Sequence, residues 1–308
     1  MQRALRTLLF ACLVLGSART AAADGVTANG PDVSPLKVGV TLHPYYSWTK
    51  NIAGTTSVEV RPVIAGEIDA GNYQPSPEDI VKLADLDAIV VNGVGHDDFI
   101  FDMLKASGND KITIIRPNDV VPLVRATNGS GMNSHTFISF SNAIQQTYAI
   151  ARALGTLRPA LAATLQANAA DYARRLRTIK ANAARPLADA RVTRVVAVHD
   201  GYAYLMQELG IEIAGVVEPA HGLVPSAAEL EGMVDLMKRE KIRVVFSEES
   251  FPAPLLTVLR DSTGARVYLL SHIAKGTYAA DEFERAMQQN ADVMIQALVR
   301  DPGATPAP

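Results

Sequence analysis

The chain has almost no cysteine. Its single cysteine, Cys12, lies in the apolar run Leu8–Gly16 near the N-terminus. Arg3 and Arg6 precede this run and the small residues Ala21–Ala23 follow it, which is the pattern of a secretory signal peptide. We expect cleavage after the last of these alanines. The mature protein would then have no disulfide and no thiolate metal site, so a metal has to be held by imidazole, carboxylate or carbonyl groups.

The chain also lacks a long hydrophobic run. Leu8–Gly16 is too short to cross a bilayer as a stable helix, so we predict a protein that is exported to the periplasm and does not span the membrane. Cys12 splits the apolar run, whereas a lipidated cysteine would end it. We therefore do not expect a lipoprotein anchor.

Charge and catalytic motifs are equally sparse. The formal net charge is −3, no basic block occurs and aromatic residues make up 6% of the chain, so nucleic acid is not an expected partner. The sequence contains no G-x-S-x-G, H-E-x-x-H or P-loop motif. We interpret Glu248-Glu249 as a turn at the end of a strand and not as a general base. The protein is therefore not predicted to be an enzyme.

What the sequence does contain is a regular alternation of strands and helices. Short runs of β-branched residues are separated by helical stretches, which predicts parallel sheets built from βαβ units. We predict an α/β fold with two lobes, each with a mostly parallel four-stranded sheet. The eight predicted strands are Lys37–Leu42, Val58–Val63, Ala88–Asn92, Lys111–Arg116, Thr193–Val198, Ile211–Val217, Ile242–Ser247 and Arg266–Ser271.

Two helical segments, Ser141–Leu154 and Pro159–Arg185, lie between the two halves, and Pro186 is expected to end the second. At ~1.5 Å per residue the second helix is about 40 Å long, enough to link both lobes as a rod. A last helix is predicted over Ala280–Leu298. The predicted organisation is a signal peptide (1–23), a flexible segment (24–35), an N-terminal lobe (36–140), connecting helices (141–186), a C-terminal lobe (187–300) and a disordered tail (301–308).

The chain has six histidines, five of which directly follow β-branched runs, while the sixth lies in a polar loop. Ligand-binding groups in α/β proteins lie at the carboxyl ends of the strands, which share one edge of a parallel sheet. Several imidazoles at such ends indicate a metal bound between them. The histidines are His43, His96, His135, His199, His221 and His272.

Several short motifs occur in a fixed order along the chain. They are Asn72-Tyr73-Gln74-Pro75-Ser76-Pro77, Asn92-Gly93-Val94-Gly95, His199-Asp200-Gly201-Tyr202, Glu218-Pro219 and Gly276-Thr277-Tyr278. This ordered set resembles the zinc- and manganese-type periplasmic substrate-binding proteins of ABC transporters, over about Val38 to Leu298. The resemblance implies two α/β lobes, one long connecting helix, a metal ion in the cleft between the lobes and an ABC permease as partner.

The resemblance also implies a set of ligands. His135 and His199 stand at matched ligand positions, and His272, after Ser271, stands where the family usually has an acidic residue. Gly71 stands where the family has its first histidine, and glycine has no side chain to offer. We expect His96, which follows the Asn-Gly-x-Gly turn, to replace it.

Other groups could complete the shell. His43 is the reserve candidate, Asn72 or a water is a further one, and His221 is expected to lie outside the site. We expect the carboxylates of Asp97, Asp200 and Glu248 to lie behind the ligands and offset part of the ion's charge.

An imidazole-only site favours Zn²⁺, with Cu²⁺, Ni²⁺ and Mn²⁺ as alternatives. The predicted function is that of a monomeric periplasmic receptor that captures Zn²⁺ between its lobes and delivers it to an ABC permease. Two alternatives remain open from the sequence. One is a zinc hydrolase with three histidines and a water, and the other is a family member whose site was lost or changed at Gly71.

Overall fold

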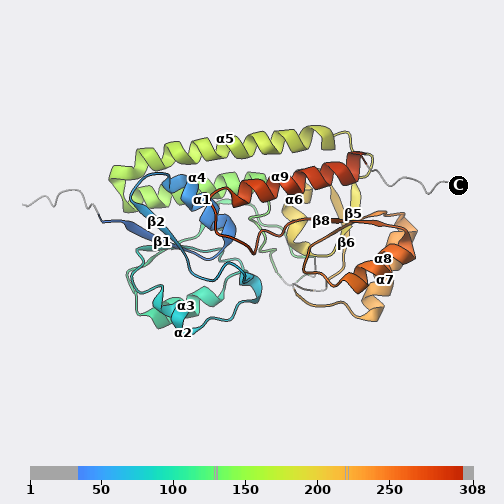
Figure 1. Cartoon of the computed structure of the whole chain (residues 1–308), viewed down its shortest axis with the longest axis horizontal. Helices are drawn as coiled ribbons and strands as arrows, with labels where there is room; N and C mark the ends of the chain where they lie inside the picture. The colour runs from blue at the N-terminus through green and yellow to red at the C-terminus, as the bar shows by residue number, and fades with distance from the viewer. Residues whose placement is uncertain (1–33, 128, 130, 219, 221, 301–308) are drawn as a thin grey trace, which may run out of the picture. The chain divides into compact units, whose positions relative to one another are not determined.

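Two lobes, each built on a parallel sheet, are bridged along one side by long helices (Figure 1). The computed structural model describes residues 34–127, 129, 131–218, 220 and 222–300. The predicted signal peptide, most of the segment 24–35, His221 and the tail 301–308 lie outside the described residues.

The two sheets have the same topology. The first has the order β2-β1-β3-β4 and the second β6-β5-β7-β8, and all pairs are parallel. The predicted α/β fold with two four-stranded sheets is confirmed. The strands are β1 (Leu36–Val40), β2 (Val58–Pro62), β3 (Ala88–Val90), β4 (Thr113–Ile115), β5 (Arg194–Ala197), β6 (Glu212–Val216), β7 (Val244–Ser247) and β8 (Arg266–Leu269).

This strand order decides where a ligand can bind. The chain leaves β1 toward one edge of the first sheet and enters β3 on the other side, and β5 and β7 repeat the pattern in the second sheet. Such a switch of direction opens a crevice at the carboxyl ends of the two strands concerned. The segments that follow β1, β3, β5 and β8 contain His43, His96, His199 and His272.

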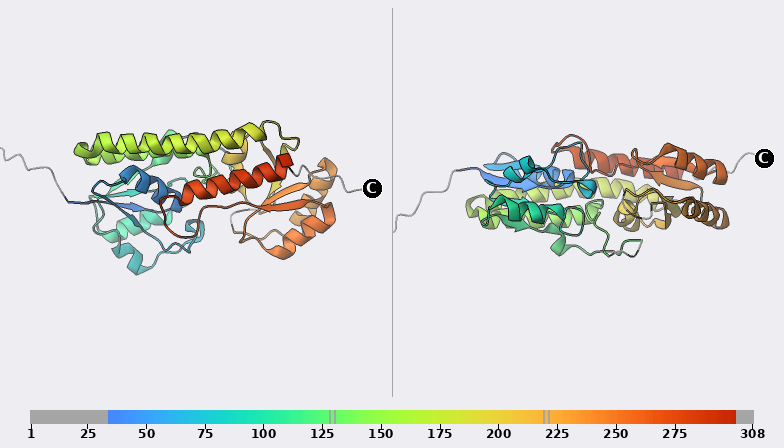
Figure 2. Two further views of the ribbon diagram at one scale, coloured as in Figure 1. Left: turned by 45° about the horizontal axis from the view of Figure 1, so that its top comes forward. Right: turned by 90° about the horizontal axis from the view of Figure 1, so that it is seen from below.

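Helices cover the sheets and join the lobes. In the views of Figures 1 and 2, α5 runs along both lobes with α9 beside it. The helices are α1 (His43–Ala53), α2 (Pro77–Val81), α3 (Phe99–Ser107), α4 (Phe140–Leu157), α5 (Ala162–Leu187), α6 (Ala203–Glu208), α7 (Ala227–Glu240), α8 (Ala253–Thr263) and α9 (Glu282–Ile295). Single turns of 3₁₀-helix occur at Ala70–Asn72, Pro117–Val120, Pro159–Leu161 and Asp200–Tyr202, and a π-helical turn at Gln296–Arg300 follows α9.

Local sequence explains several helix boundaries. Ser226 and Glu229 form a reciprocal capping box at the start of α7, which satisfies two backbone donors. Pro186 lies inside the last turn of α5, which ends one residue later at Leu187. The interpretation of His43 as a strand-end residue is wrong. β1 ends at Val40, and His43 with Pro44 begins α1, because proline suits the first helical turn.

The hydrophobic core is continuous from the first sheet through the connecting helices to one face of the second sheet. Alternate residues of β5 and of the position after it divide between two clusters: Val195 and Ala197 belong to this core, while Val196 and Val198 pack beneath α7 and α8. This division follows from the two-residue repeat of a strand. Helices therefore cover both faces of the second sheet.

A second connection between the lobes follows β8. The Ser47 hydroxyl and the Asn51 amide on α1 donate to the carbonyls of Ala279 and Ala280, each over 2.7 Å. The Gly276 amide donates to the Gly66 carbonyl over 2.9 Å. These bonds fix the segment after His272 to α1 and to the loop after β2.

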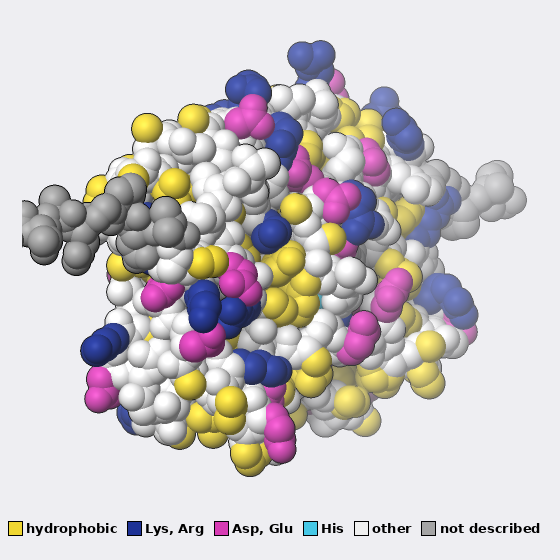
Figure 3. Space-filling model, turned by 60° about the vertical axis from the view of Figure 1, so that its left-hand side comes forward, with side chains coloured by type: hydrophobic (Ala, Val, Ile, Leu, Met, Phe, Trp, Pro, Cys, Tyr) yellow, Lys and Arg dark blue, Asp and Glu magenta, His cyan; other side chains and the backbone are white. Residues whose placement is uncertain are grey.

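On the face shown in Figure 3, basic and acidic side chains are interspersed. This distribution agrees with ion pairs such as that of Asp85 with Lys37 and Arg61. Within the part of the chain that the structure describes, no helix is both long and apolar enough to pass through a membrane.

Candidate metal centre

Three histidines from separate segments converge between the lobes. One nitrogen of each ring lies within 4.8 Å of the others, and the three side chains are buried. His135 lies in the loop before α4, His199 directly follows β5, and His272 follows β8. Their relative exposures are 6%, 2% and 9%. These are three of the four positions at which the sequence predicted ligands, and the fourth is His96.

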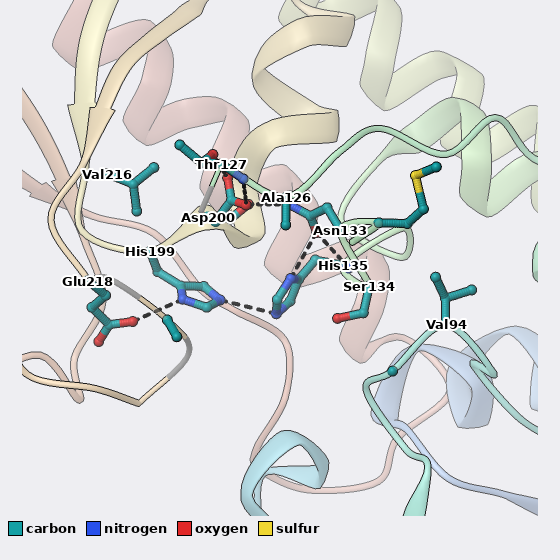
Figure 4. A pocket seen from close by; sticks show the side chains of 13 residues that line it. Val94, Ala126, Thr127, Asn133, Ser134, His135, His199, Asp200, Val216 and Glu218 are labelled. Carbon is teal, nitrogen blue, oxygen red and sulfur yellow. Dashed lines mark hydrogen bonds and ion pairs between the residues drawn. The ribbon is translucent and has the colours of Figure 1, made fainter. Parts of the chain in front are cut away.

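Hydrogen bonds fix the tautomers of two of these rings. Nδ1 of His135 lies 3.0 Å from Oδ1 of Asn133, and Nδ1 of His199 lies 3.0 Å from Oε2 of Glu218 (Figure 4). Oδ1 of Asn133 also accepts the His135 amide, while its Nδ2 donates to the Asp200 carbonyl, so the amide is oriented unambiguously. Both acceptors are oxygens, so Nδ1 of each ring is the donor, and Nε2 is the nitrogen on the opposite side that can bind a metal ion.

The two Nε2 atoms point at each other. Nε2 of His135 and Nε2 of His199 lie 3.1 Å apart (Figure 4). Two nitrogen lone pairs repel at this distance unless a proton or a cation lies near both. Ligands that bond one zinc ion at about 2.0–2.1 Å are themselves roughly 3 Å apart. The separation is therefore close to that expected for two ligands of one ion.

The third imidazole has carboxylates on its Nδ1 side. Nδ1 of His272 lies 3.7 Å from Oδ2 of Asp69 and 4.0 Å from Oε2 of Glu248. A carboxylate behind a ligating histidine orients its ring and increases its basicity. Each of the three rings thus has an oxygen-bearing side chain near Nδ1, and for His135 and His199 this arrangement directs Nε2 toward the other ring.

His96 lies beside this group but is not one of its three members. Its ring centroid is 4.9 Å from that of His135 and 6.1 Å from that of His272. Its Nε2 lies 3.7 Å from Oδ1 of Asp69. The same carboxylate therefore faces His96 and His272, which come from different lobes.

The reserve candidate, His43, lies in a different setting. Its ring stacks on Tyr278 with 4.1 Å between centroids and 3° between planes, and its Nε2 donates to the Gly276 carbonyl over 3.0 Å. Burial lowers the pKa of His43. These contacts give it a role in joining α1 to the segment after His272.

Three carboxylates were predicted to lie behind the ligands. Glu248 lies beside one of the three histidines, whereas Asp97 and Asp200 bind other groups. Glu248 faces His272. Asp97 accepts hydrogen bonds from the Thr41 hydroxyl and from the amides of Asn92 and Gly93, so it stabilises the Asn-Gly-x-Gly turn. Burial raises the pKa of Asp97. Asp98, next to it, is the N-cap of α3 but makes no capping side-chain bond.

Asp200 joins two segments. Its carboxylate accepts from the amide and the hydroxyl of Thr127, in the polar stretch before His135 (Figure 4). The Tyr204 hydroxyl donates to the Asn133 carbonyl over 2.7 Å and accepts from the Val124 amide over 3.2 Å. The chain just after His199 therefore holds both ends of the stretch 124–133.

Sequence reasoning missed Asn133, Glu218 and Asp69 as partners of the histidines. The position of Glu218 beside His199 could have been predicted from the pairing of the strands that precede them. β6 lies next to β5, and the Glu218 amide bonds to the Val198 carbonyl, which places Glu218 beside His199. Asp69 had no such signal, because it reaches the site from a loop between β2 and α2.

A half-open cavity of about 520 Å³ lies against His135 and His199. Its wall includes Val94 and Ser134 on one side and Val216 and Glu218 on the other (Figure 4). At roughly 30 Å³ per water, this volume exceeds that of an ion with six waters. The cavity therefore has room for a hydrated ion beside these two histidines.

Solved structures similar to this chain include metal-binding proteins. The substrate-binding protein FpvC from Pseudomonas aeruginosa, in complex with Mn²⁺, is 41% identical with a TM-score of 0.82, covering 88% of this chain and all of that one. FpvC in complex with Ni²⁺ is 40% identical with the same TM-score, covering 89% of this chain and all of that one. ZnuA, at 23% identity and a TM-score of 0.73 over 84% of this chain and 99% of that one, shows the shared fold.

Among curated proteins, the zinc-binding lipoprotein AdcA of Streptococcus pneumoniae is 23% identical over 278 residues, or 85% of this chain and 55% of that protein. The chain thus spans about half the length of this relative. A putative metal-binding protein of Treponema pallidum is 23% identical over 276 residues, or 85% of this chain and 87% of that protein.

Residues 38–297 match the family described as zinc-uptake complex component A, periplasmic. This match covers most of the chain, and it agrees with the two-lobed fold and the convergent histidines. The alternative of a zinc hydrolase is set aside by this match and by the similarity to FpvC. The chain belongs to the zinc-uptake complex component A family of periplasmic metal-binding proteins, which are substrate-binding proteins and not enzymes.

Proposed function

We propose that this protein is a periplasmic receptor that binds one divalent transition-metal ion between its lobes and delivers it to an ABC permease. The observation that carries this proposal is the pair of Nε2 atoms, on His135 and His199, that face each other across 3.1 Å. A cation between them removes the repulsion of their lone pairs. His272 supplies the third ligand.

His96 is the proposed fourth ligand. With the predicted lobe boundaries, His96 and His135 belong to the N-terminal lobe, and His199 and His272 to the C-terminal lobe. An ion bound by all four would bridge the lobes. The small separation of the His96 and His135 rings, 4.9 Å between centroids, supports this assignment because a small displacement would bring His96 to the ion.

Zn²⁺ is the proposed cargo, and Ni²⁺ is the strongest competitor. Imidazole suits zinc, copper and nickel, whereas manganese prefers oxygen ligands. Neutral imidazoles leave the charge of the ion uncompensated, and the carboxylates of Asp69, Glu218 and Glu248 beside the rings offset part of it. FpvC structures contain Mn²⁺ or Ni²⁺, so these are the two ions whose affinities should be compared with that of Zn²⁺.

Metal titration of the mature protein, purified without a histidine tag and stripped with a chelator, tests the proposal. We expect one Zn²⁺ per chain, displaced more readily by Ni²⁺ than by Mn²⁺. His199→Ala should abolish this binding, and His221→Ala is the matched control that should retain it. If the wild-type protein takes up none of these ions, the result supports the alternative that this family member has lost or changed its metal site at Gly71.

Export and delivery need separate tests. The mature protein should be recovered from the periplasm with an N-terminus just after Ala23. Cells that lack the protein should grow more slowly than wild-type cells in zinc-poor medium. Expression of the wild-type protein should restore their growth rate, and expression of His199→Ala should not.

A further inference from the structure

Ile273, the residue directly after His272, has a left-handed backbone. Its φ is 58°, and in the part of the chain that the structure describes only one other non-glycine residue, Lys241 at the end of α7, has a positive φ. A left-handed backbone costs an L-residue a factor of about 5–30 in population, and it is rarest for β-branched side chains. Such a conformation persists only where the surrounding structure holds it.

The chain is anchored on both sides of this residue. The amide of Ser271 donates to Oδ1 of Asn290 over 2.7 Å, and Nδ2 of Asn290 donates back to the Ser271 carbonyl over 2.9 Å, which fixes this residue to α9. On the other side, the Gly276 amide donates to the Gly66 carbonyl over 2.9 Å. A change of φ between these two anchors therefore has to be absorbed within a short segment that includes His272.

The peptide bond between His272 and Ile273 is also held in place, because the Ile273 amide donates to Oγ of Ser271 over 3.2 Å. With this peptide plane fixed, φ decides the direction of the Ile273 side chain. In the left-handed conformation the side chain is 3% exposed and belongs to the core that is continuous through both lobes. Its apolar burial offsets the cost of the backbone conformation. The core contact of Ile273 and the orientation of the peptide bond beside His272 therefore depend on each other.

We propose that Ile273 is a positioning residue for the metal centre: its buried side chain keeps the backbone left-handed, and this backbone holds the ring of His272 in the centre. This inference rests on the proposed function, because it concerns how a ligand of the same centre is placed. A residue at 273 that has a Cβ atom but no core contact should relax toward negative φ. It should then turn the peptide bond away from Ser271 and displace the imidazole. A glycine there can keep the left-handed backbone with no side chain to hold it.

Two substitutions at position 273 separate backbone conformation from core packing. Ile273→Ala should weaken Zn²⁺ binding at least about tenfold, measured against a competing chelating dye, because a ligand is displaced. Ile273→Gly removes more of the side chain, yet it should bind Zn²⁺ at least about threefold more tightly than Ile273→Ala, since glycine adopts the left-handed backbone without cost. Core packing alone predicts the reverse order, because the larger truncation leaves the larger cavity. In a His272→Ala background the two substitutions should have equal Zn²⁺ affinities, because the ligand on which they act is absent.

Two other positions provide matched controls. Lys241→Gly should be more stable than Lys241→Ala, because the backbone there is also left-handed, and both should bind Zn²⁺ like the wild type. Ile211 is a buried isoleucine of the same core whose φ is not positive. Ile211→Gly should therefore be less stable than Ile211→Ala, again with unchanged Zn²⁺ affinity. At position 273 of the metal-free protein, the thermal midpoint of the glycine variant should exceed that of the alanine variant by roughly 2–4 °C.

Crystals of the two metal-free variants give a readout that does not depend on metal binding. We expect the His272 ring to be displaced in Ile273→Ala, with the bond to Oγ of Ser271 lost, and to stay in place in Ile273→Gly, with a positive φ at residue 273. An unmoved ring or wild-type Zn²⁺ affinity in Ile273→Ala, weaker binding by Ile273→Gly than by Ile273→Ala, or failure of both variants to fold would each overturn the proposal. Failure of Ile273→Ala alone to fold would support it. A wild-type protein that binds no metal would instead contradict the proposed function, and the two crystal structures would still test the placement of His272.

Discussion

Glu218 lies directly behind His199: its Oε2 is 3.0 Å from Nδ1, on the side of the ring opposite the Nε2 that faces His135. The carboxylate fixes the tautomer and adds negative charge next to the proposed ion. Glu218→Gln should therefore weaken Zn²⁺ binding by about 10- to 100-fold, which titration against a competing chelator would measure. Glu212→Gln, at an exposed residue at the start of β6, the strand before Glu218, is the control and should have no effect.

Asp200 is expected to control how long the ion stays bound. Its carboxylate holds Thr127, and its carbonyl accepts from the Asn133 amide that orients His135. Loss of these contacts frees the stretch before His135, so Asp200→Asn and Thr127→Val should each speed metal release about three- to tenfold. Stopped-flow mixing with excess chelator measures this rate.

The association rate should change little in both variants, and the double variant should release metal no faster than Asp200→Asn alone. Asp261→Asn, at an exposed ion pair on α8, is the control. Equal release rates for Asp200→Asn and the wild type would refute a role for Asp200 in retention.

His43 should contribute to acid sensitivity. Burial lowers its pKa below the ordinary value of 6.5, against opposing contributions from the Gly276 and Gly66 backbone and from Asp69 and Glu67. Between its lowered pKa and 6.5, the unfolded chain binds a proton that the folded protein does not. The free energy of unfolding should therefore fall as the pH drops below about 6.5.

Urea unfolding of metal-free protein between about pH 5 and pH 8 checks this expectation, with a chelator present to remove metal effects. His43→Phe keeps a ring that can stack on Tyr278 but cannot be protonated. It should be less stable than the wild type at pH 8, because the bond to Gly276 is lost, and should lose less stability on acidification. Identical slopes for both proteins would show that His43 does not contribute.

Glu208 is a stability determinant away from the metal centre. Its carboxylate, 8% exposed, accepts hydrogen bonds from the Ser139 hydroxyl and from the amides of Phe140 and Ser141 at the start of α4, and it pairs with Lys180 of α5. Glu208→Ala should lower the free energy of unfolding by roughly 2–3 kcal/mol, because charged hydrogen bonds are lost.

Chemical denaturation of metal-free protein measures this loss. Glu231→Ala, an exposed residue on α7, should change stability by less than about 0.5 kcal/mol. Zn²⁺ affinity should be close to that of the wild type in both variants. A stability loss of the same size in both would mean that the contacts of Glu208 with α4 and α5 contribute nothing.

The sequence predicted both sheets because each strand is a short apolar run between helical stretches, a pattern with few alternatives. The positions of His135, His199 and His272 could be carried over from motifs for the same reason. The first strand was predicted to run to Leu42, because Thr41 and Leu42 continue its apolar and β-branched pattern. β1 ends at Val40, and α1 begins at His43.

Partners across the site were harder to predict. Asp200 follows a ligand in the chain, which suggested that it supports the ion, but its carboxylate binds Thr127 from a distant segment. Asp69 and Asn133 reach the histidines from loops, whose course is set by tertiary contacts and not by periodicity. Short-range patterns therefore located the ligands, whereas the groups that orient them emerged from the fold.

The most direct test of the central claim is a crystal structure of the Zn²⁺-loaded protein with anomalous scattering at the zinc edge. The account predicts a single strong peak bonded to Nε2 of His135, His199 and His272 at about 2.0–2.1 Å, with His96 drawn toward it. A peak at another place, or an ion bound through Nδ1 of His135 or His199, would contradict the account.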